Sequence, residues 1–243
     1  MRRCFALAAF AALALPRRAS AMHIADGVLP PAACLGWAVA CVPFLSASLR
    51  AYRLRTAADP FAKALVATAA ALVFVFSSVE IPLPLGTSAH ACGVALAAIL
   101  LGPSLAVLAA LVAVVLEAFL LGHGGVTALG ADLASMGIAG AFAGWAVFRV
   151  FRAAGAGVAP GAFAAALAGN LATYGVASLQ LASALAPPGG FGRTLLGVAV
   201  GYAPAELPMI AIESVVTSLA VAFLARRRPD VLVRLGVASG DPA

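Results

Sequence analysis

Long apolar runs alternate with short polar or basic segments along this chain of 243 residues. A stretch of roughly 18–20 apolar residues is long enough to cross a bilayer as a helix. The runs are continuous and rich in Ala, Leu and Val, whereas the strands of a membrane barrel alternate apolar and polar positions. The pattern therefore predicts an all-α, polytopic membrane protein. We expect seven transmembrane helices, at about 32–49, 61–79, 92–101, 104–121, 133–148, 162–186 and 195–224.

Prolines and glycines interrupt this pattern where a helix has to end or bend. Two prolines and a glycine exclude a regular helix from 80–90, which we expect to form an outer loop or a re-entrant stretch. In the fifth span, Gly137, Gly140 and Gly144 line one face. Small residues at this spacing let two helices approach closely, so this face is predicted to contact another helix.

Basic residues lie mainly in short segments at the ends of predicted spans, and the positive-inside rule assigns such segments to the cytoplasm. The first, fifth and seventh spans each end in one, and with seven crossings all three fall on the same side. The N-terminus is then outside and the C-terminus cytoplasmic, with only Arg193 on the outer side. The three segments contain Arg50, Arg53, Arg55, Arg149, Arg152, Arg226, Arg227 and Arg228.

The composition narrows the function classes. Hydrophobic residues make up 64% of the chain and charged residues 10%, against about 25% charged in a soluble domain. The net charge of +6 is concentrated at span ends, so we interpret it as a topology signal facing anionic lipid and expect no nucleic-acid partner. Lys63 is the only lysine and the chain has no G-x-x-x-x-G-K-[ST] motif, so we expect no ATP bound through a P-loop.

Residues 1–21 have the features of a signal peptide: arginines at the start, an apolar core and a small-residue cleavage site that ends at Ala21. Two arginines lie just before that site, where positive charge is disfavoured, so translation that starts at Met22 is the alternative. Both interpretations make Met22 residue one and His23 residue two. An uncleaved N-terminal anchor is the third interpretation, although its apolar core is short for a spanning helix.

The three histidines of the chain, His23, His90 and His123, all fall on the outer side of the predicted topology. If Met22 is the first residue, its amine, the deprotonated amide nitrogen of His23 and the His23 imidazole can close two fused chelate rings. These nitrogens lie nearly in a plane, and either His90 or His123 could complete a square. Square-planar nitrogen sites suit Ni(II) and Cu(II), and Co(II) can also enter them. For each ring, a solvated or hydrogen-bonded histidine at a membrane interface is the simpler alternative.

Several carboxylates are also candidates for function. Glu117, Glu206 and Glu213 fall within apolar spans, where ionisable residues tend to be functional. The simpler interpretation is that they form hydrogen bonds with polar residues in the bundle interior. Asp26 and Asp132 lie near the loops and are candidates for orienting a metal-binding imidazole.

Several segments resemble the CbiM/NikM family, the substrate-binding (S) components of energy-coupling-factor (ECF) transporters for cobalt and nickel. The most specific stretches are MHIADGVLP at 22–30 and HGGVTALGADLASMGIAG at 123–140. The similarity continues through 88–90, 170–182 and 206–219, so it covers essentially the whole chain after residue 21.

The resemblance implies a seven-helix bundle with the N-terminus inserted into its centre from the outer side. It implies Co²⁺ or Ni²⁺ as the transported substrate, held by Met22, His23 and His90, with His123 near the site. The implied partners are a transmembrane coupling (T) subunit, cytoplasmic ATPase subunits and often a small accessory membrane protein. Their ATP hydrolysis would drive the transport.

This chain also departs from the family pattern. A Gln is common at the position of Glu117 and an Asn at that of Asp132, and in the cobalt branch a Pro often replaces Ala91. The metal ligands are kept, so the departures leave the choice between cobalt and nickel open.

These observations predict a multi-pass protein of the bacterial inner membrane that captures a metal ion and is not itself an enzyme. The resemblance links this role to cobalt supply for cobalamin biosynthesis. A stand-alone channel or secondary carrier that uses Glu117 and Glu213 is the alternative, and an intramembrane enzyme that uses His123 and a carboxylate as acid and base is the third hypothesis. The expected signal peptide, metal-binding tip, seven-helix domain and cytoplasmic tail span 1–21, 22–31, 32–228 and 229–243.

Overall fold

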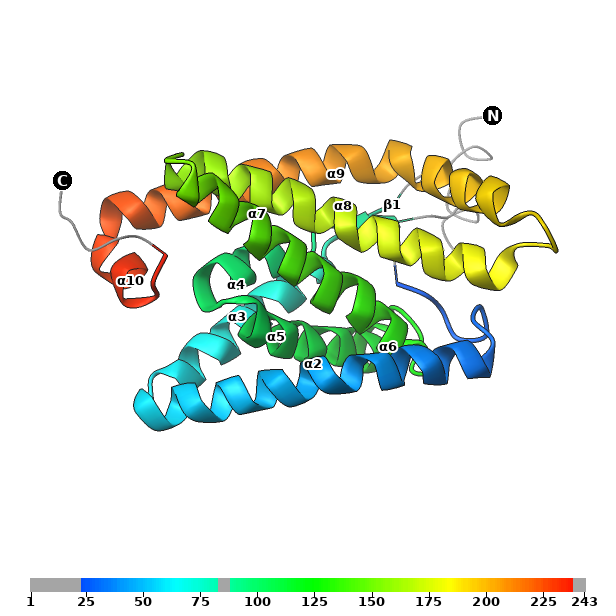
Figure 1. The fold of residues 1–243 in the computed structure, drawn as a ribbon, viewed down its shortest axis with the longest axis horizontal. Helices are drawn as coiled ribbons and strands as arrows, with labels where there is room; N and C mark the ends of the chain where they lie inside the picture. Colours follow the sequence, from blue (N-terminus) through cyan, green and yellow to red (C-terminus); the bar gives the residue numbers. More distant parts are fainter. Residues whose placement is uncertain (1–22, 83–87, 238–243) are drawn as a thin grey trace, which may run out of the picture.

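Helices form at each of the seven apolar runs in the computed structural model, which describes residues 23–82 and 88–237 (Figure 1). The signal peptide expected at 1–21 and the first ligand, Met22, lie outside these described residues. The elements are α2 (Pro31–Ala58), α3 (Ala62–Ser78), β1 (Glu80–Pro82), β2 (Ser88–His90), α4 (Val94–Leu101), α5 (Pro103–Leu116), η2 (Glu117–Leu121), α6 (Leu129–Asp132), η3 (Leu133–Gly140), α7 (Ala141–Ala153), α8 (Val158–Leu185), α9 (Phe191–Arg227) and α10 (Pro229–Arg234).

Five helical stretches among the described residues are long and apolar enough to cross a membrane. The third predicted span is different, because α4 has only eight residues. At a rise of 1.5 Å per residue such a helix is about 12 Å long, less than half of the roughly 30 Å hydrocarbon core. The multi-pass architecture is thus present, while the count of seven crossings and the outside position of the N-terminus stay predictions. The five stretches are Pro31–Ala58, Pro103–Leu121, Leu129–Ala153, Val158–Leu185 and Phe191–Arg227.

The short helix α4 lies at the centre of the bundle. All its residues from Val94 to Ile99 are buried, and it packs against α5, α7 and α8. Its N-cap Gly93 and its C-cap Gly102 both have positive φ, at 67° and 84°, a conformation that glycine adopts without steric cost. Two glycine turns therefore let the chain enter the bundle at His90, run through its centre and leave at Gly102.

The predicted glycine face is confirmed as a helix contact. A Cβ added at Gly140 would lie 2.6 Å from the Thr173 hydroxyl of α8, and one added at Gly144 would lie 3.1 Å from the Ala165 carbonyl oxygen. The first distance would force a neighbour to move, and the second is tighter than most contacts of a real Cβ. The close approach of α8 to the η3–α7 segment depends on these two glycines.

A short antiparallel hairpin occupies the segment that was expected to form an outer loop or a re-entrant stretch. Its register pairs Glu80 with His90 and Pro82 with Ser88. The prolines here exclude a helix, but a proline is compatible with an edge strand because its missing N–H can face away from the partner. The backbone pairing at Glu80 fixes the point where His90 enters the bundle.

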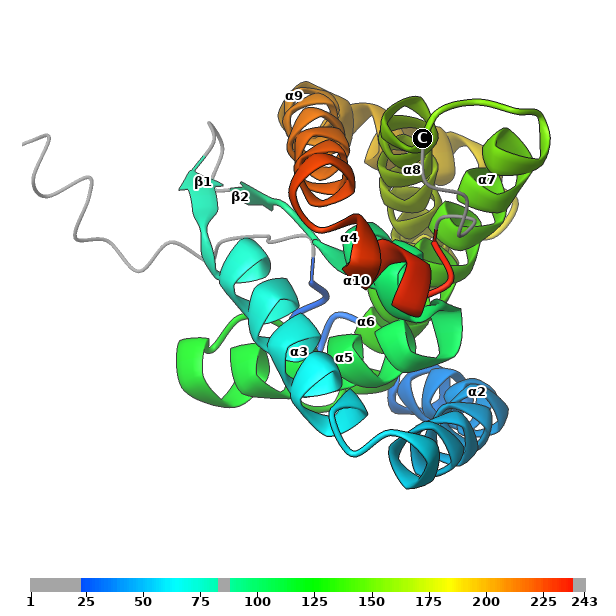
Figure 2. The same cartoon turned by 90° about the vertical axis from the view of Figure 1, so that its left-hand side faces the viewer.

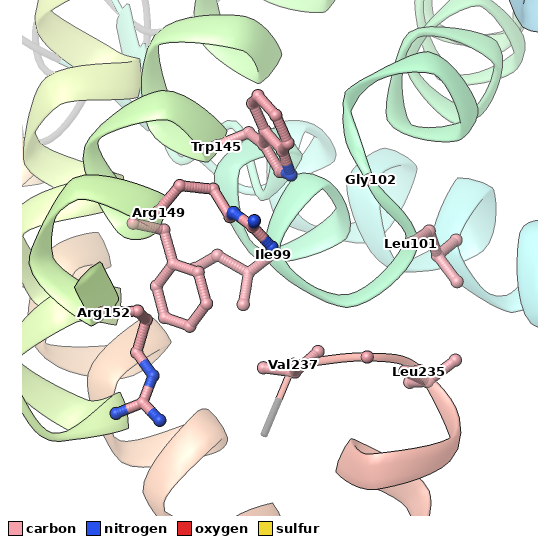
Figure 3. Close-up of a pocket in the computed structure, with 10 residues that line it drawn as sticks. Ile99, Leu101, Gly102, Trp145, Arg149, Arg152, Leu235 and Val237 are labelled. Carbon is pink, nitrogen blue, oxygen red and sulfur yellow. The ribbon is translucent and has the colours of Figure 1, made fainter. Parts of the chain in front are cut away.

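The basic segments meet at one end of the bundle, as the charge pattern predicted. A crevice at this end is lined by Gly102, by Arg149 and Arg152 at the end of α7, and by Leu235 (Figure 3). A neighbouring crevice joins Gly102 to Arg55 near the end of α2. The helix ends that carry most of the arginines therefore lie together.

The segment after Arg228 forms more than a polar tail. Helix α10 lies across the basic end of the bundle, in front of α4 in the end-on view (Figure 2). Leu232 is 1% exposed and belongs to an apolar cluster with Leu96, Phe148 and Val221. The exposed ion pair between Arg234 and Asp59, at 2.7 Å, connects this segment to the α2–α3 turn.

The close contact between α2 and α6 at Gly130 leads us to predict that a larger residue there destabilises the protein. A Cβ at Gly130 would lie 2.6 Å from the Cα of Ala38, which is backbone and cannot move aside cheaply. Gly130→Ala should lower the free energy of unfolding by about 1–3 kcal/mol, the usual cost of overpacking. Thermal unfolding in detergent would measure this. Gly197→Ala is the matched control, because a Cβ there meets nothing within 4 Å. An unchanged melting temperature for Gly130→Ala would contradict the packing described.

Candidate metal centre

Three histidines from distant parts of the chain meet inside the bundle. His23 lies in the segment before α2, His90 ends β2, and His123 follows η2. Their side-chain nitrogens that could bind a metal all lie within 4.8 Å of one another. The three residues are 3%, 1% and 6% exposed. Donors opposite each other around an ion with bonds of about 2.1 Å are roughly 4 Å apart, so the cluster needs only a small contraction to share one ion.

The rings contact one another directly. His23 and His90 are stacked, with ring centroids 5.1 Å apart and an angle of 28° between the planes. His123 meets both rings edge-on, at 4.8 Å from His23 and 5.0 Å from His90. Burial lowers the pKa of His23 well below its ordinary value, and the neighbouring His90 and His123 lower it further. His23 is therefore neutral, the form in which an imidazole binds a metal.

The N-terminal tip, residues 23–30, is docked on the loop that follows η2 through its backbone. The amide of Ile24 donates to Asp132 Oδ1 at 2.9 Å, and its carbonyl accepts from the amide of Gly125 at 2.9 Å. The two glycines of the His-Gly-Gly segment make room for this approach. A Cβ on Gly124 would lie 3.0 Å from the Cβ of His23, and one on Gly125 would lie 2.5 Å from the Asp26 amide nitrogen.

Asp26 holds the same loop from the other side of the tip. Its Oδ1 accepts from the amide of Thr127 at 2.8 Å and from the Thr127 hydroxyl at 2.5 Å, and its Oδ2 accepts from the Val126 amide at 3.2 Å. The hydrogen bond from the Thr127 hydroxyl, with those from the two amides, lowers the pKa of Asp26. The ionised carboxylate thus clamps the loop backbone to the tip.

Glu117 is the site residue that the sequence analysis did not assign to the histidines. Its Oε2 lies 3.3 Å from His23 Nδ1, and the residue is 0% exposed. The Ser77 hydroxyl contacts its Oε1, and its carbonyl accepts from the amide of His123 at 3.1 Å. Glu117 begins the π-helical turn η2, a geometry that recurs at functional sites. His123 lies six positions further along the chain, and this spacing at a span end was the available signal.

The other two intramembrane carboxylates lie on α9. Glu213 accepts hydrogen bonds from the amides of Cys92 and Gly93, at 2.7 and 2.9 Å, and so holds the backbone just after His90. Glu206 is 2% exposed, and its two carboxylate oxygens have no hydrogen-bond partner among the described residues. The predicted hydrogen bonding to polar residues of α8 applies to Glu213, which also interacts with Asn170.

The structure therefore brings together His23, His90 and His123, with Glu117 beside them. His123 was expected near the site and stands in direct ring contact with the other two. Asp26 and Asp132 were candidates for orienting an imidazole, whereas the hydrogen bonds described above go to the backbone and hydroxyl groups that dock the tip. The crevice of Figure 3 is a different feature, because it lies at the far end of α4 from His90.

The chain is similar to cobalt transport proteins over most of its length. The profile of the CbiM family, described as "Cobalt uptake substrate-specific transmembrane region", matches residues 23–231. A "Cobalt transport protein CbiM" of Sorangium cellulosum is 44% identical over 217 residues, covering 89% of this chain and 96% of that protein. Its counterpart in Geobacter sulfurreducens is 41% identical and covers 95% and 67%. A crystal structure of a transition metal transporter superposes with a TM-score of 0.69 at 25% identity, covering 84% of this chain and 92% of that one.

Docking of the tip can be tested without any metal. Gly125→Ala places a methyl group 2.5 Å from the Asp26 amide nitrogen, so the tip has to move away from the loop. Overpacking of about 1.4 kcal/mol corresponds to a tenfold change in an equilibrium. Hydrogen–deuterium exchange of residues 23–28 should therefore accelerate about tenfold or more. Gly36→Ala is the control, since a Cβ there meets nothing within 4 Å. Equal exchange in the two variants would show that the tip is not held by this contact.

Proposed function

The chain belongs to the CbiM family of cobalt uptake membrane proteins, and from this premise we propose that it is the substrate-capture component of an ATP-driven ECF-type importer for Co²⁺ or Ni²⁺. It is a multi-pass protein of a bacterial membrane, and the relatives named above are transport proteins. The observation that carries the proposal is the buried cluster of His23, His90 and His123.

The proposed site combines this cluster with a free N-terminus at Met22. The amine of Met22, the amide nitrogen of His23 and the His23 imidazole would form the fused chelate, and His90 would supply the fourth nitrogen. Backbone docking supports this arrangement, because the hydrogen bonds of Ile24 and Asp26 hold the tip with His23 inside the bundle. His123 contacts both rings and would steady them.

The proposed direction of transport follows from the charges. The arginine-rich helix ends would face the cytoplasm, and the tip would open to the outer side. On this view the coupling subunit, the ATPase subunits and an accessory membrane protein complete the importer, and the ATP chemistry belongs to the ATPases. Nitrogen donors and a buried site suit Co²⁺ and Ni²⁺ and are poor for Mg²⁺ or Ca²⁺.

A stand-alone carrier is the second candidate, and Glu206 is the observation in its favour. A buried carboxylate without a partner is costly, so a cation that passes through the bundle could pair with it. Such a carrier would depend on Glu206 and Glu213 more than on the tip. Glu117 does not separate the two hypotheses, because it lies beside His23.

Intact mass spectrometry of the purified protein with Ni²⁺ or Co²⁺ tests the proposal. A mass that starts at Met22, with one metal ion bound, is the expected result. His23→Ala, and a separate variant with one glycine added before Met22, should each weaken binding more than about 100-fold, beyond the 10–100-fold typical of residues that only support a ligand.

Glu206→Gln is the matched control for this experiment, because it changes a buried carboxylate that is not part of the proposed chelate. It should bind metal as the wild type does. Metal binding by a protein that retains residues 1–21 would refute the N-terminal chelate. Metal uptake in cells that is lost with Glu206→Gln but kept with the added glycine would instead favour the carrier.

A further inference from the structure

Glu117 is a fully buried carboxylate within the candidate span Pro103–Leu121, directly beside a proposed metal ligand. A buried carboxylate is stable in its ionised form only when a cation or several hydrogen bonds compensate the loss of water. Here His23 Nδ1 is 3.3 Å from Oε2, while Ser77 contacts Oε1. One oxygen is therefore anchored by a hydroxyl, and the other points at the ring that the chelate would use.

The spacing of the two atoms fits a shared metal ion. With bonds of about 2.1 Å, donors 3.3 Å apart subtend roughly 100° at the ion. This angle is between that of neighbouring corners of a square and that of a tetrahedron. Glu117 Oε2 and His23 Nδ1 can thus bind one ion at adjacent positions without moving apart.

The backbone fixes Glu117 relative to a second histidine. The amide of His123 donates to the Glu117 carbonyl at 3.1 Å, which closes the π-helical turn η2. Ser77, the anchor of the carboxylate, is 0% exposed near the end of α3, one residue before the helix stops. The Glu117 carboxylate and His123 therefore reach the site from the same turn, and α3 holds the carboxylate through Ser77.

We propose that Glu117 binds the transported metal ion through Oε2, so that the site holds one carboxylate oxygen together with its nitrogens. This inference rests on the proposed function. An oxygen ligand adds negative charge and raises the number of donors above the four nitrogens of a square. Four nitrogens in a square favour Ni²⁺, whereas a mixed set of nitrogen and oxygen donors shifts the balance toward Co²⁺. Glu117 would then be the residue that sets metal preference.

The test is metal titration of wild type and Glu117→Gln in the same detergent, with Co²⁺ and with Ni²⁺. Glutamine has the same shape, and its carbonyl oxygen can still accept the hydrogen bond from Ser77, but the NH₂ group that takes the place of Oε2 is a donor and does not bind a metal ion. The variant should bind Co²⁺ at least about tenfold more weakly, because even residues that only support a ligand cost 10–100-fold when they are removed. It should keep most of its affinity for Ni²⁺, and the visible absorption of bound Co²⁺ should change. Glu206→Gln is the control and should match the wild type in all three measurements.

The outcomes separate the inference from the function it rests on. A wild type that binds neither metal, or whose binding survives His23→Ala, refutes the proposed function. A wild type that binds while Glu117→Gln shows the same affinities and the same Co²⁺ spectrum overturns the inference alone, because Glu117 is then only a hydrogen-bond acceptor. Loss of both metals in Glu117→Gln also overturns it, since the nitrogens were expected to hold Ni²⁺ without the carboxylate. Retained Ni²⁺ binding shows at the same time that the variant is folded.

Discussion

A backbone segment that enters an apolar bundle has to find a partner for each of its peptide groups, because lipid offers none. The N-terminal tip meets this constraint at Ile24, whose amide and carbonyl are both taken up by the loop that follows η2. These two hydrogen bonds fix the backbone of Ile24, the residue next to His23, inside the protein. The clamp of Asp26 on Thr127 holds the other side of the same segment. Without this docking, His23 would not be held beside His90 and His123.

The second histidine ring, that of His90, reaches the site from a different part of the chain. The hairpin of β1 and β2 brings the chain in at His90, and Glu213 holds the two amides at Cys92 and Gly93 that follow. From there α4 runs through the centre to Gly102 at the basic end. The eight residues of α4 therefore make up most of the connection between His90 and the end of the bundle where the arginines gather. Alanine and glycine packing around α4 makes this direct route sterically accessible.

Much of this could be predicted from the sequence, and the failures have physical causes. Apolar length and basic span ends located the seven apolar runs at which helices form, and small residues at Gly140 and Gly144 predicted a helix contact. Hydropathy does not show which apolar run lies at the centre of the bundle, so the sequence alone did not indicate that the eight-residue α4 would be buried among α5, α7 and α8. The hairpin was missed because its strands have only three residues each, too few for an alternation of apolar and polar positions to be recognised, and β1 contains a proline. Residues 229–243 were expected to be only a cytoplasmic tail, since Leu232 is buried by contacts that are distant in sequence.

The candidate site, too, could be predicted from the sequence only in part. Residue type and predicted topology put the histidines on one side, but no periodicity could show that Glu117 on one helix would face His23 on the tip. The three buried glutamates in fact occupy three different electrostatic environments. Glu213 is satisfied by two backbone amides, and Glu206 has no hydrogen-bond partner among the residues that the structure describes. Glu117 alone among them is within 3.3 Å of a ring nitrogen in the histidine cluster. A divalent cation placed among neutral imidazoles leaves its full charge uncompensated in a medium of low dielectric constant, and an adjacent carboxylate lowers that cost. Hydropathy does not show which of the three glutamates lies beside the histidines. The position of Glu117 nevertheless changes the charge of the proposed metal site, and with it the ions that the site can hold.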